Sequence, residues 1–259
     1  MNILFIGDLV GPAAVHYLTG RLPELRRTHA IDLVIANAEN SAPGGAGMTV
    51  SLNTALFAYG VDVITSGNHS WDGGEAEQAL AQDRVLRPYN LPSGVSGSGV
   101  ISVQVGDEVV TVINLADSAA MNRLYTPTIP ADLISAFTCW EGIPRQGTVI
   151  VDYHGESMNG KQAFAHFVDG QAAAVLGTHT HEPTLLLHLL ANGTAFVGDV
   201  GMTGSYGGVQ GFDPPLFIRR YLGHPEAEEY AKVVEAPISL AAVLLHTIAG
   251  RTTAIRRLT

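Results

Sequence analysis

The chain has 259 residues, of which 46% are hydrophobic and only 15% charged. This length and composition predict one compact domain over residues 1–259. The formal net charge of −10 argues against duplex nucleic acid as a partner, because gripping a phosphate backbone requires clustered lysine and arginine. No apolar run is long enough to cross a bilayer, and the N-terminus lacks the basic region of a signal peptide. We therefore expect no membrane association and a cytoplasmic location.

The first part of the chain alternates short apolar runs with segments of helical spacing. Strands are expected at residues 2–6, 32–36 and 61–65, and helices at residues 12–29, 49–59 and 75–82. Thr49 or Ser51 is a suitable cap for the second of these helices. Continuous apolar strands separated by helices predict a parallel sheet that is covered on both faces.

The middle of the chain changes character. Residues 99–105 and 108–114 flank Gly106-Asp107, which predicts a β-hairpin. A polar stretch with Pro127 and Pro130 leads into a helix that we expect near residues 131–140. Further strands are expected at residues 148–153, 172–176, 185–190 and 194–197. The glycine-rich residues 198–211 are interpreted as an ordered loop of the active site.

Polar side chains follow five of the expected strands, at the point where each strand ends. In open α/β sheets, ligands bind beyond the carboxyl ends of the strands, so these side chains are expected to face one region. They comprise two carboxylates, two amides and four imidazoles, namely Asp8, Glu39, Asn40, Asn68, His69, His154, His179 and His181.

Oxygen and imidazole ligands without thiolate are typical of Mn, Fe, Zn or Mg sites. Eight candidate groups are too many for one closed site, and they suit two divalent metal ions that share a bridging carboxylate. His179 and His181 have i, i+2 spacing, which places both side chains on one face of an extended segment. Two divalent ions with two carboxylates leave a positively charged site, which favours a phosphodiester monoanion over a dianionic monoester.

Each of these residues has a simpler interpretation when it is taken alone. An aspartate after a strand is usually a cap or turn residue, and a single histidine is more often part of the core or surface. Repeated placement at strand ends favours the metal cluster. We expect Asp72 to cap the helix after Trp71, and Asp199 to fix the glycine-rich turn. The other histidines lack partners at ligand spacing and are interpreted as structural: His16, His29, His166, His188, His224 and His246.

The order of short motifs along the chain resembles that of a known family. GD, NAEN, GNHSWD, RPYN, VDYH, GTHTH and GDVGMTG follow one another between Asn2 and Gly204. In this order they are similar to the YmdB-type bacterial phosphodiesterases, a branch of the calcineurin-like metallophosphoesterases. The resemblance implies an α/β fold, specifically a four-layer α-β-β-α sandwich of the metallophosphoesterase type.

The resemblance also implies a dinuclear centre of iron or manganese. Asp8 and His181 would bind one metal, and Glu39 would bridge to the second. Four further ligands would complete the second metal site, namely Asn40, Asn68, His154 and His179.

The reaction that the resemblance implies is hydrolysis of a small phosphodiester. A hydroxide bridging the metals would attack phosphorus, since metal binding lowers the pKa of water to about 7. His69 would then protonate the leaving alkoxide as the general acid. Members of the family hydrolyse cyclic nucleotides, notably 2′,3′-cyclic ones, and artificial diesters, and the family also implies homo-oligomers.

Three departures from the family pattern bear on this prediction. Val10 stands where the wider superfamily has a histidine, a loss that is typical of the YmdB branch. The segment that usually reads AEATSEK is GESMNGK at residues 155–161, and Ala116-Asp117 replaces the usual Gly-Arg. These altered segments leave a second hypothesis, a metal-containing regulatory protein that senses a nucleotide with little catalytic activity. A metal-dependent amidohydrolase is disfavoured by the asparagine ligands and the GNH triplet.

Overall fold

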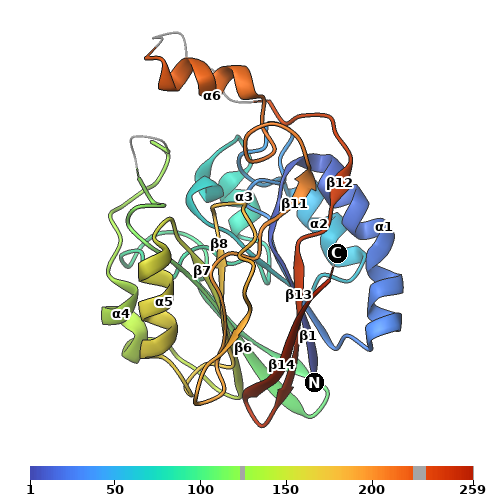
Figure 1. Ribbon diagram of the computed structural model, residues 1–259. Coiled ribbons are helices and arrows are strands. Elements are labelled where there is room, and N and C mark those ends of the chain that lie inside the picture. Colours follow the sequence, from blue (N-terminus) through green and yellow to red (C-terminus); the bar gives the residue numbers. More distant parts are fainter. Residues whose placement is uncertain (123–125, 224–231, 259) are drawn as a thin grey trace.

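The computed structural model describes residues 1–122, 126–223 and 232–258. Two mixed β-sheets pack against each other in the middle of the molecule (Figure 1). The first sheet comprises β1 (Asn2–Ile6), β3 (Leu33–Asn37), β4 (Val63–Thr65), β13 (Ala242–Ile248) and β14 (Arg251–Leu258). Its order is β14-β13-β1-β3-β4, in which β1, β3 and β4 are parallel and the C-terminal hairpin extends the sheet antiparallel to β1.

The second sheet is built from the middle of the chain. Its strands are β5 (Val100–Val105), β6 (Glu108–Ala116), β7 (Thr148–His154), β8 (Ala174–Thr178), β9 (His188–Leu189) and β10 (Ala195–Val197), in the order β5-β6-β7-β8-β10-β9. The expected hairpin is confirmed as β5 and β6. A small third sheet of β2 (Asp8–Leu9), β11 (Met202–Ser205) and β12 (Ile238–Ser239) joins Asp8 to the glycine-rich segment.

The helices are α1 (Gly11–His29), α2 (Val50–Ala58), α3 (Ala76–Leu80), α4 (Ala136–Cys139), α5 (Met158–Phe167) and α6 (Pro214–Tyr221). Two 3₁₀ turns, η1 (Asn68–Trp71) and η2 (Trp140–Gly142), complete the set of helical segments in the described ranges. Among these residues, none of the helices combines the length and the hydrophobicity that a bilayer crossing requires.

Alternating side chains of the strands separate the core into layers. Leu4 of β1 packs with Leu18 of α1 on the outer face of the first sheet. Phe5 points the other way and packs with Ile150 of β7 between the two sheets. Phe164 of α5 packs on the outer face of the second sheet. Helices therefore cover one face of each sheet while the sheets cover each other, and the expected four-layer α-β-β-α sandwich is confirmed (Figure 1).

Several boundaries differ from the sequence predictions. The strands are covered on both faces as expected, but by helices on one face and by the second sheet on the other. The helix expected at residues 131–140 shortens to α4 with η2, and the strand expected at 185–190 shortens to β9, because Leu185 and Leu186 are exposed. The sequence patterns did not predict α5 or the hairpin of β13 and β14. The cap prediction at Thr49 is confirmed, since its hydroxyl accepts a hydrogen bond from Leu52 N.

Candidate metal centre

The two sheets are joined by buried hydrogen bonds at the edge where their parallel strands end. Asp152 of β7 accepts hydrogen bonds from Asn37 of β3, at 3.1 Å, and from Thr65 of β4. Asp152 lies two residues before His154, the last residue of β7. The polar residues that follow β1, β3 and β4 therefore meet those that follow β7 and β8.

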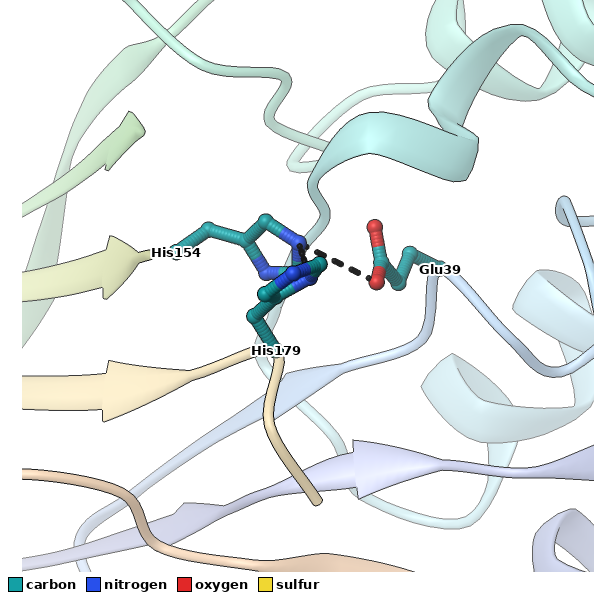
Figure 2. A group of neighbouring side chains, drawn as sticks. All are labelled: Glu39, His154 and His179. Carbon is teal, nitrogen blue, oxygen red and sulfur yellow. Dashed lines mark hydrogen bonds and ion pairs between the residues drawn. The ribbon is translucent and has the colours of Figure 1, made fainter. Parts of the chain in front are cut away.

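Nε2 of His154 lies at the middle of a cluster of side chains from three different parts of the chain. It is 2.9 Å from Oδ1 of Asn68, 3.0 Å from Nδ1 of His179 and 3.2 Å from Oε1 of Glu39. Figure 2 shows Glu39 and His179 facing the ring of His154. One ligand atom from each of these three residues lies within 4.8 Å of the others, close enough to hold one metal ion.

The tautomer of His154 follows from the groups behind its ring. Thr178 Oγ1 donates to Asp152 Oδ1 over 2.7 Å and lies 3.0 Å from Nδ1 of His154. Because the hydroxyl proton is used on the carboxylate, Nδ1 of His154 is the donor to Thr178. Its Nε2 consequently carries a lone pair, which is the arrangement of a metal-ligating histidine.

The neighbours of His154 also present lone pairs to the same point. Asn68 Nδ2 donates to Thr126 Oγ1 over 2.9 Å, so the amide oxygen of Asn68 faces His154. His179 Nε2 lies 3.1 Å from a carboxylate oxygen of Glu156, which makes Nε2 the donor and leaves Nδ1 as an acceptor. Acceptors that face one another without a proton repel each other, and a cation among them removes that repulsion.

A second group of site residues leaves oxygen atoms without partners. Oδ1 of Asp8 and Oδ1 of Asn40 are buried and have no hydrogen-bond partner within residues 1–122, 126–223 and 232–258. Asp8 is tied to the cluster through its other oxygen, which accepts from His179 N over 3.2 Å. His181 directs Nδ1 to the carbonyl of Gln210 at 3.0 Å, so its Nε2 is left for a ligand. Unpartnered buried oxygens are costly unless something else satisfies them, and a metal ion fits this requirement.

Burial shifts the titration of these groups in opposite directions. It raises the pKa of Asp8 to about 8, with a further contribution from the carboxylate of Asp199, and raises that of Glu39 well above its usual range. Burial also lowers the pKa of His154, and lowers that of His179 to about 3. Neutral imidazoles are in the state that binds a metal ion, and a bound cation would replace the protons of the carboxyl groups.

Gly67 allows η1 to approach the cluster closely. A Cβ at this position would collide with the ring of His154 and with Oε2 of Glu39. The backbone N–H of His69 donates to the same oxygen of Glu39 over 3.2 Å. Only glycine leaves room for the backbone here, which explains why Asn68 and His69 follow a glycine.

The turn after β8 is held by a buried ion pair. His179 and His181 both have left-handed backbone, with φ of 98° and 63°, which is costly for residues other than glycine. Oδ2 of Asp199 accepts from N and Oγ1 of Thr180, between the two histidines. Lys161 is fully buried, and its Nζ lies 3.1 Å from the same oxygen. The prediction that Asp199 fixes the glycine turn is confirmed by its 2.8 Å bond from Gly201 N, but it also holds the histidine turn.

His69 lies at the rim of the site, with 28% of its side chain exposed. Its Nδ1 is 2.6 Å from Oδ2 of Asp72, which leaves Nε2 open to a bound substrate. The prediction that Asp72 caps a helix is wrong, because α3 begins only at Ala76 and the carboxylate turns back towards His69. Among the other histidines, His224 lies outside the described residues, and those within them are absent from the contacts of this site.

The altered segments of the chain contact one another. Asp117 Oδ2 accepts a hydrogen bond from Ser157 N over 2.9 Å, and a Cβ at Gly155 would collide with the same carboxylate. Glu156 and Lys161, from the altered segment, both support the histidine turn. Val10 is buried at the start of α1 and donates its N–H to Thr203 O.

Solved structures share the four-layer fold of this chain. The chain resembles a 5′-nucleotidase precursor from Thermus thermophilus with a TM-score of 0.55 at 11% identity, over 99% of this chain and 54% of that chain. This likeness shows a shared fold, the four-layer α/β sandwich. Within it, the model of the YmdB-like proteins matches residues 4–258, and the chain belongs to this family.

The chain also resembles more similar proteins, including the following two. The chain is 36% identical over 222 residues to a 2′,3′-cyclic-nucleotide 2′-phosphodiesterase of Bacillus subtilis strain 168, a match that covers 85% of this chain and 82% of the relative. The structure of this chain also matches that of a novel phosphatase of Mycoplasma pneumoniae with a TM-score of 0.89 at 26% identity. The match covers 100% of this chain and 92% of the phosphatase. The family and fold implied by the motifs are confirmed, whereas the roles of individual site residues stay predictions.

Proposed function

We propose that this chain is a metal-dependent phosphodiesterase that hydrolyses small phosphodiesters, such as 2′,3′-cyclic nucleotides, at a dinuclear centre within one domain of residues 1–259. The observation that carries the proposal is the set of lone pairs facing Nε2 of His154, together with the unpartnered oxygens of Asp8 and Asn40. The name of the Bacillus relative supports the substrate class and supports hydrolysis over sensing alone.

The proposed ligands divide between two ions, with Fe or Mn preferred for their oxygen and imidazole donors. Asp8 and His181 would hold one ion, and Glu39 would bridge to the other. Four side chains would complete the second site, namely Asn40, Asn68, His154 and His179. When bound, the ions would supply a hydroxide nucleophile near neutral pH and neutralise charge on the phosphoryl oxygens.

The chain's own side chains would orient the reaction and move its proton. Thr178 and Asp152 keep the lone pair of His154 directed into the site. His69 would give a proton from Nε2 to the leaving alkoxide, while Asp72 holds Nδ1 and forms an ion pair with the ring when it is protonated. The partial exposure of His69 lets the leaving group depart towards solvent.

The proposal is tested with purified protein that is loaded with Mn²⁺ or stripped with a chelator. Loaded protein is expected to hydrolyse bis-p-nitrophenyl phosphate and 2′,3′-cAMP, stripped protein to hydrolyse neither, and Asp8→Asn to bind less metal. Protein that holds two metals by elemental analysis and hydrolyses neither substrate would overturn the proposal and favour a sensing role.

A further inference from the structure

Residues 126–130, which we call the threonine strap, lie against the turn that carries Asn68. Thr126 is buried, and its hydroxyl accepts the amide N–H of Asn68 over 2.9 Å. Two residues later, the hydroxyl of Thr128 donates to Oδ1 of Asp72. The other oxygen of Asp72 holds Nδ1 of His69. One short segment thus contacts a proposed metal ligand directly and the proposed general acid through one carboxylate.

The strap is fixed in place by its own turn and by an apolar contact. Ile129 N donates to Thr126 O over 3.3 Å, which closes a turn with Pro127 at its second position, where proline is favoured. Ile129 is 4% exposed and belongs to a small apolar cluster with Met121, against which Trp71 packs. Since Trp71 ends η1, this cluster joins the strap to the turn in addition to the polar contacts with Asn68 and with Asp72, the residue that follows η1.

We propose that the strap positions two groups with separate tasks, an inference that rests on the proposed function. Thr126 accepts the amide N–H of Asn68 and so holds the amide oxygen towards His154, whereas a flipped amide would aim N–H groups at a cation. Thr128 fixes the plane of the Asp72 carboxylate, and thereby the direction of the His69 ring. Both threonines are positioning residues that act through another side chain.

The roles of the two threonines are distinguished by measuring hydrolysis rates and Mn²⁺ binding of Thr126→Val and Thr128→Val. Thr128→Val is expected to slow hydrolysis of 2′,3′-cAMP roughly 3- to 10-fold, the range for one lost hydrogen bond. It should slow bis-p-nitrophenyl phosphate less, because nitrophenolate leaves without a proton, and its Mn²⁺ content should match the wild type. Thr126→Val is expected to weaken Mn²⁺ binding on the order of 10-fold. Its losses on the two substrates should be equal, and excess Mn²⁺ should restore both.

Matched controls lie next to each other on β14. Thr252 is a buried threonine whose hydroxyl donates to Ala173 O, and Thr253 is an exposed one whose hydroxyl donates to His246 O. Thr252→Val and Thr253→Val remove comparable hydroxyl groups far along the sequence from the strap. The serine variants at 126 and 128 keep the hydroxyl and should restore wild-type behaviour.

Two readouts do not depend on turnover, so failure of the inference differs from failure of the proposed function. Titration of the stripped Thr126→Val variant with Mn²⁺ measures its metal affinity directly. The ¹⁵N–¹H imidazole signal of His69, assigned with His69→Ala, should change in Thr128→Val and stay in place in Thr253→Val. Wild-type Mn²⁺ affinity in Thr126→Val, an unchanged His69 signal in Thr128→Val, or equal losses on both substrates in Thr128→Val would overturn the inference.

Discussion

Two histidines of the same site lie in contrasting surroundings. His154 is fully buried at the end of β7, and its Nδ1 is satisfied by the hydroxyl of Thr178. His69 lies on η1 at the rim, and its Nδ1 is satisfied by the carboxylate of Asp72. His154 contacts a neutral hydroxyl, which in turn donates a hydrogen bond to the carboxylate of Asp152. His69 contacts a carboxylate directly.

The difference indicates different tasks for the same side chain. A neutral, buried imidazole with a fixed lone pair is suited to a metal ion, and burial lowers the pKa of His154 further in that direction. A partly exposed imidazole beside a carboxylate is suited to carrying a proton, because the charged ring finds a counter-charge at 2.6 Å. The comparison therefore predicts that changes around His154 affect metal binding and changes around His69 affect proton transfer.

The largest effect is expected from His154→Ala. Mutation of a group that supports a ligand typically lowers metal affinity roughly 10- to 100-fold, and removal of the ligand itself should lower it more. The rates on both substrates should fall by the same factor. Elemental analysis of the purified variant should show reduced metal. The control is His16→Ala, since His16 is exposed and its ring contacts only Pro12 O among the hydrogen bonds of the described residues. Full metal content in His154→Ala would contradict its assignment as a ligand.

His69→Ala should retain its metal and lose rate selectively. Hydrolysis of 2′,3′-cAMP should fall by about 10²–10⁴-fold, because the alkoxide then leaves without a proton. The loss on bis-p-nitrophenyl phosphate should be far smaller, and steady-state rates on both substrates measure the split. Equal losses on the two substrates would remove the distinction between the histidines.

Asp152→Asn tests the support of His154 without touching the ring. Asp152 accepts three hydrogen bonds, and an amide N–H in place of either oxygen would face a donor. The hydroxyl of Thr178 would then be free to donate to Nδ1 of His154. The imidazole proton of His154 would consequently lie on Nε2. Metal affinity should fall about 10- to 100-fold in a Mn²⁺ titration, and Thr178→Val should give a similar loss. An Asp152→Asn variant with wild-type affinity would show that the hydroxyl link is dispensable.

Local sequence patterns were sufficient for the elements that carry this site. The apolar run of β1 and the helical spacing of α1 depend on neighbouring residues, and both lie where they were expected. Polar residues at strand ends marked the ligand candidates, because parallel strands of the sandwich end at a common edge. The C-terminal hairpin and α5 were missed.

The supporting groups could not be predicted, because their partners are distant in the chain. A lysine is expected at the surface, yet Lys161 is fully buried against Asp199, which lies 38 residues further on. Thr126 is 58 residues from Asn68. Asp72 is the exception, since its partner His69 is only three residues away, but an aspartate before an expected helix also fits a cap, which is how it was interpreted.

The smallest expected effect is the pH dependence of stability in the metal-free chain. The histidine ligands and the carboxyl groups contribute to it in different ways. Burial raises the pKa of Asp8 to about 8 and that of Asp152 to about 7, against about 3.9 in an unfolded chain, while that of His179 falls to about 3. Below about pH 6.5 the two kinds of group oppose each other, because folding binds protons at the carboxyl groups and releases them from the histidines.

Above about pH 6.5 the histidines are neutral in both states, and only the carboxyl groups still bind protons on folding, so metal-free protein should lose stability as pH rises towards about 8. Bound metal replaces the proton of Asp8, so loaded protein should show a smaller loss. Melting temperatures with chelator and with Mn²⁺ at the two ends of this range measure the difference. Asp8→Asn, which cannot ionise, should flatten the metal-free profile, and an equally steep decline in that variant would show that Asp8 does not cause the effect.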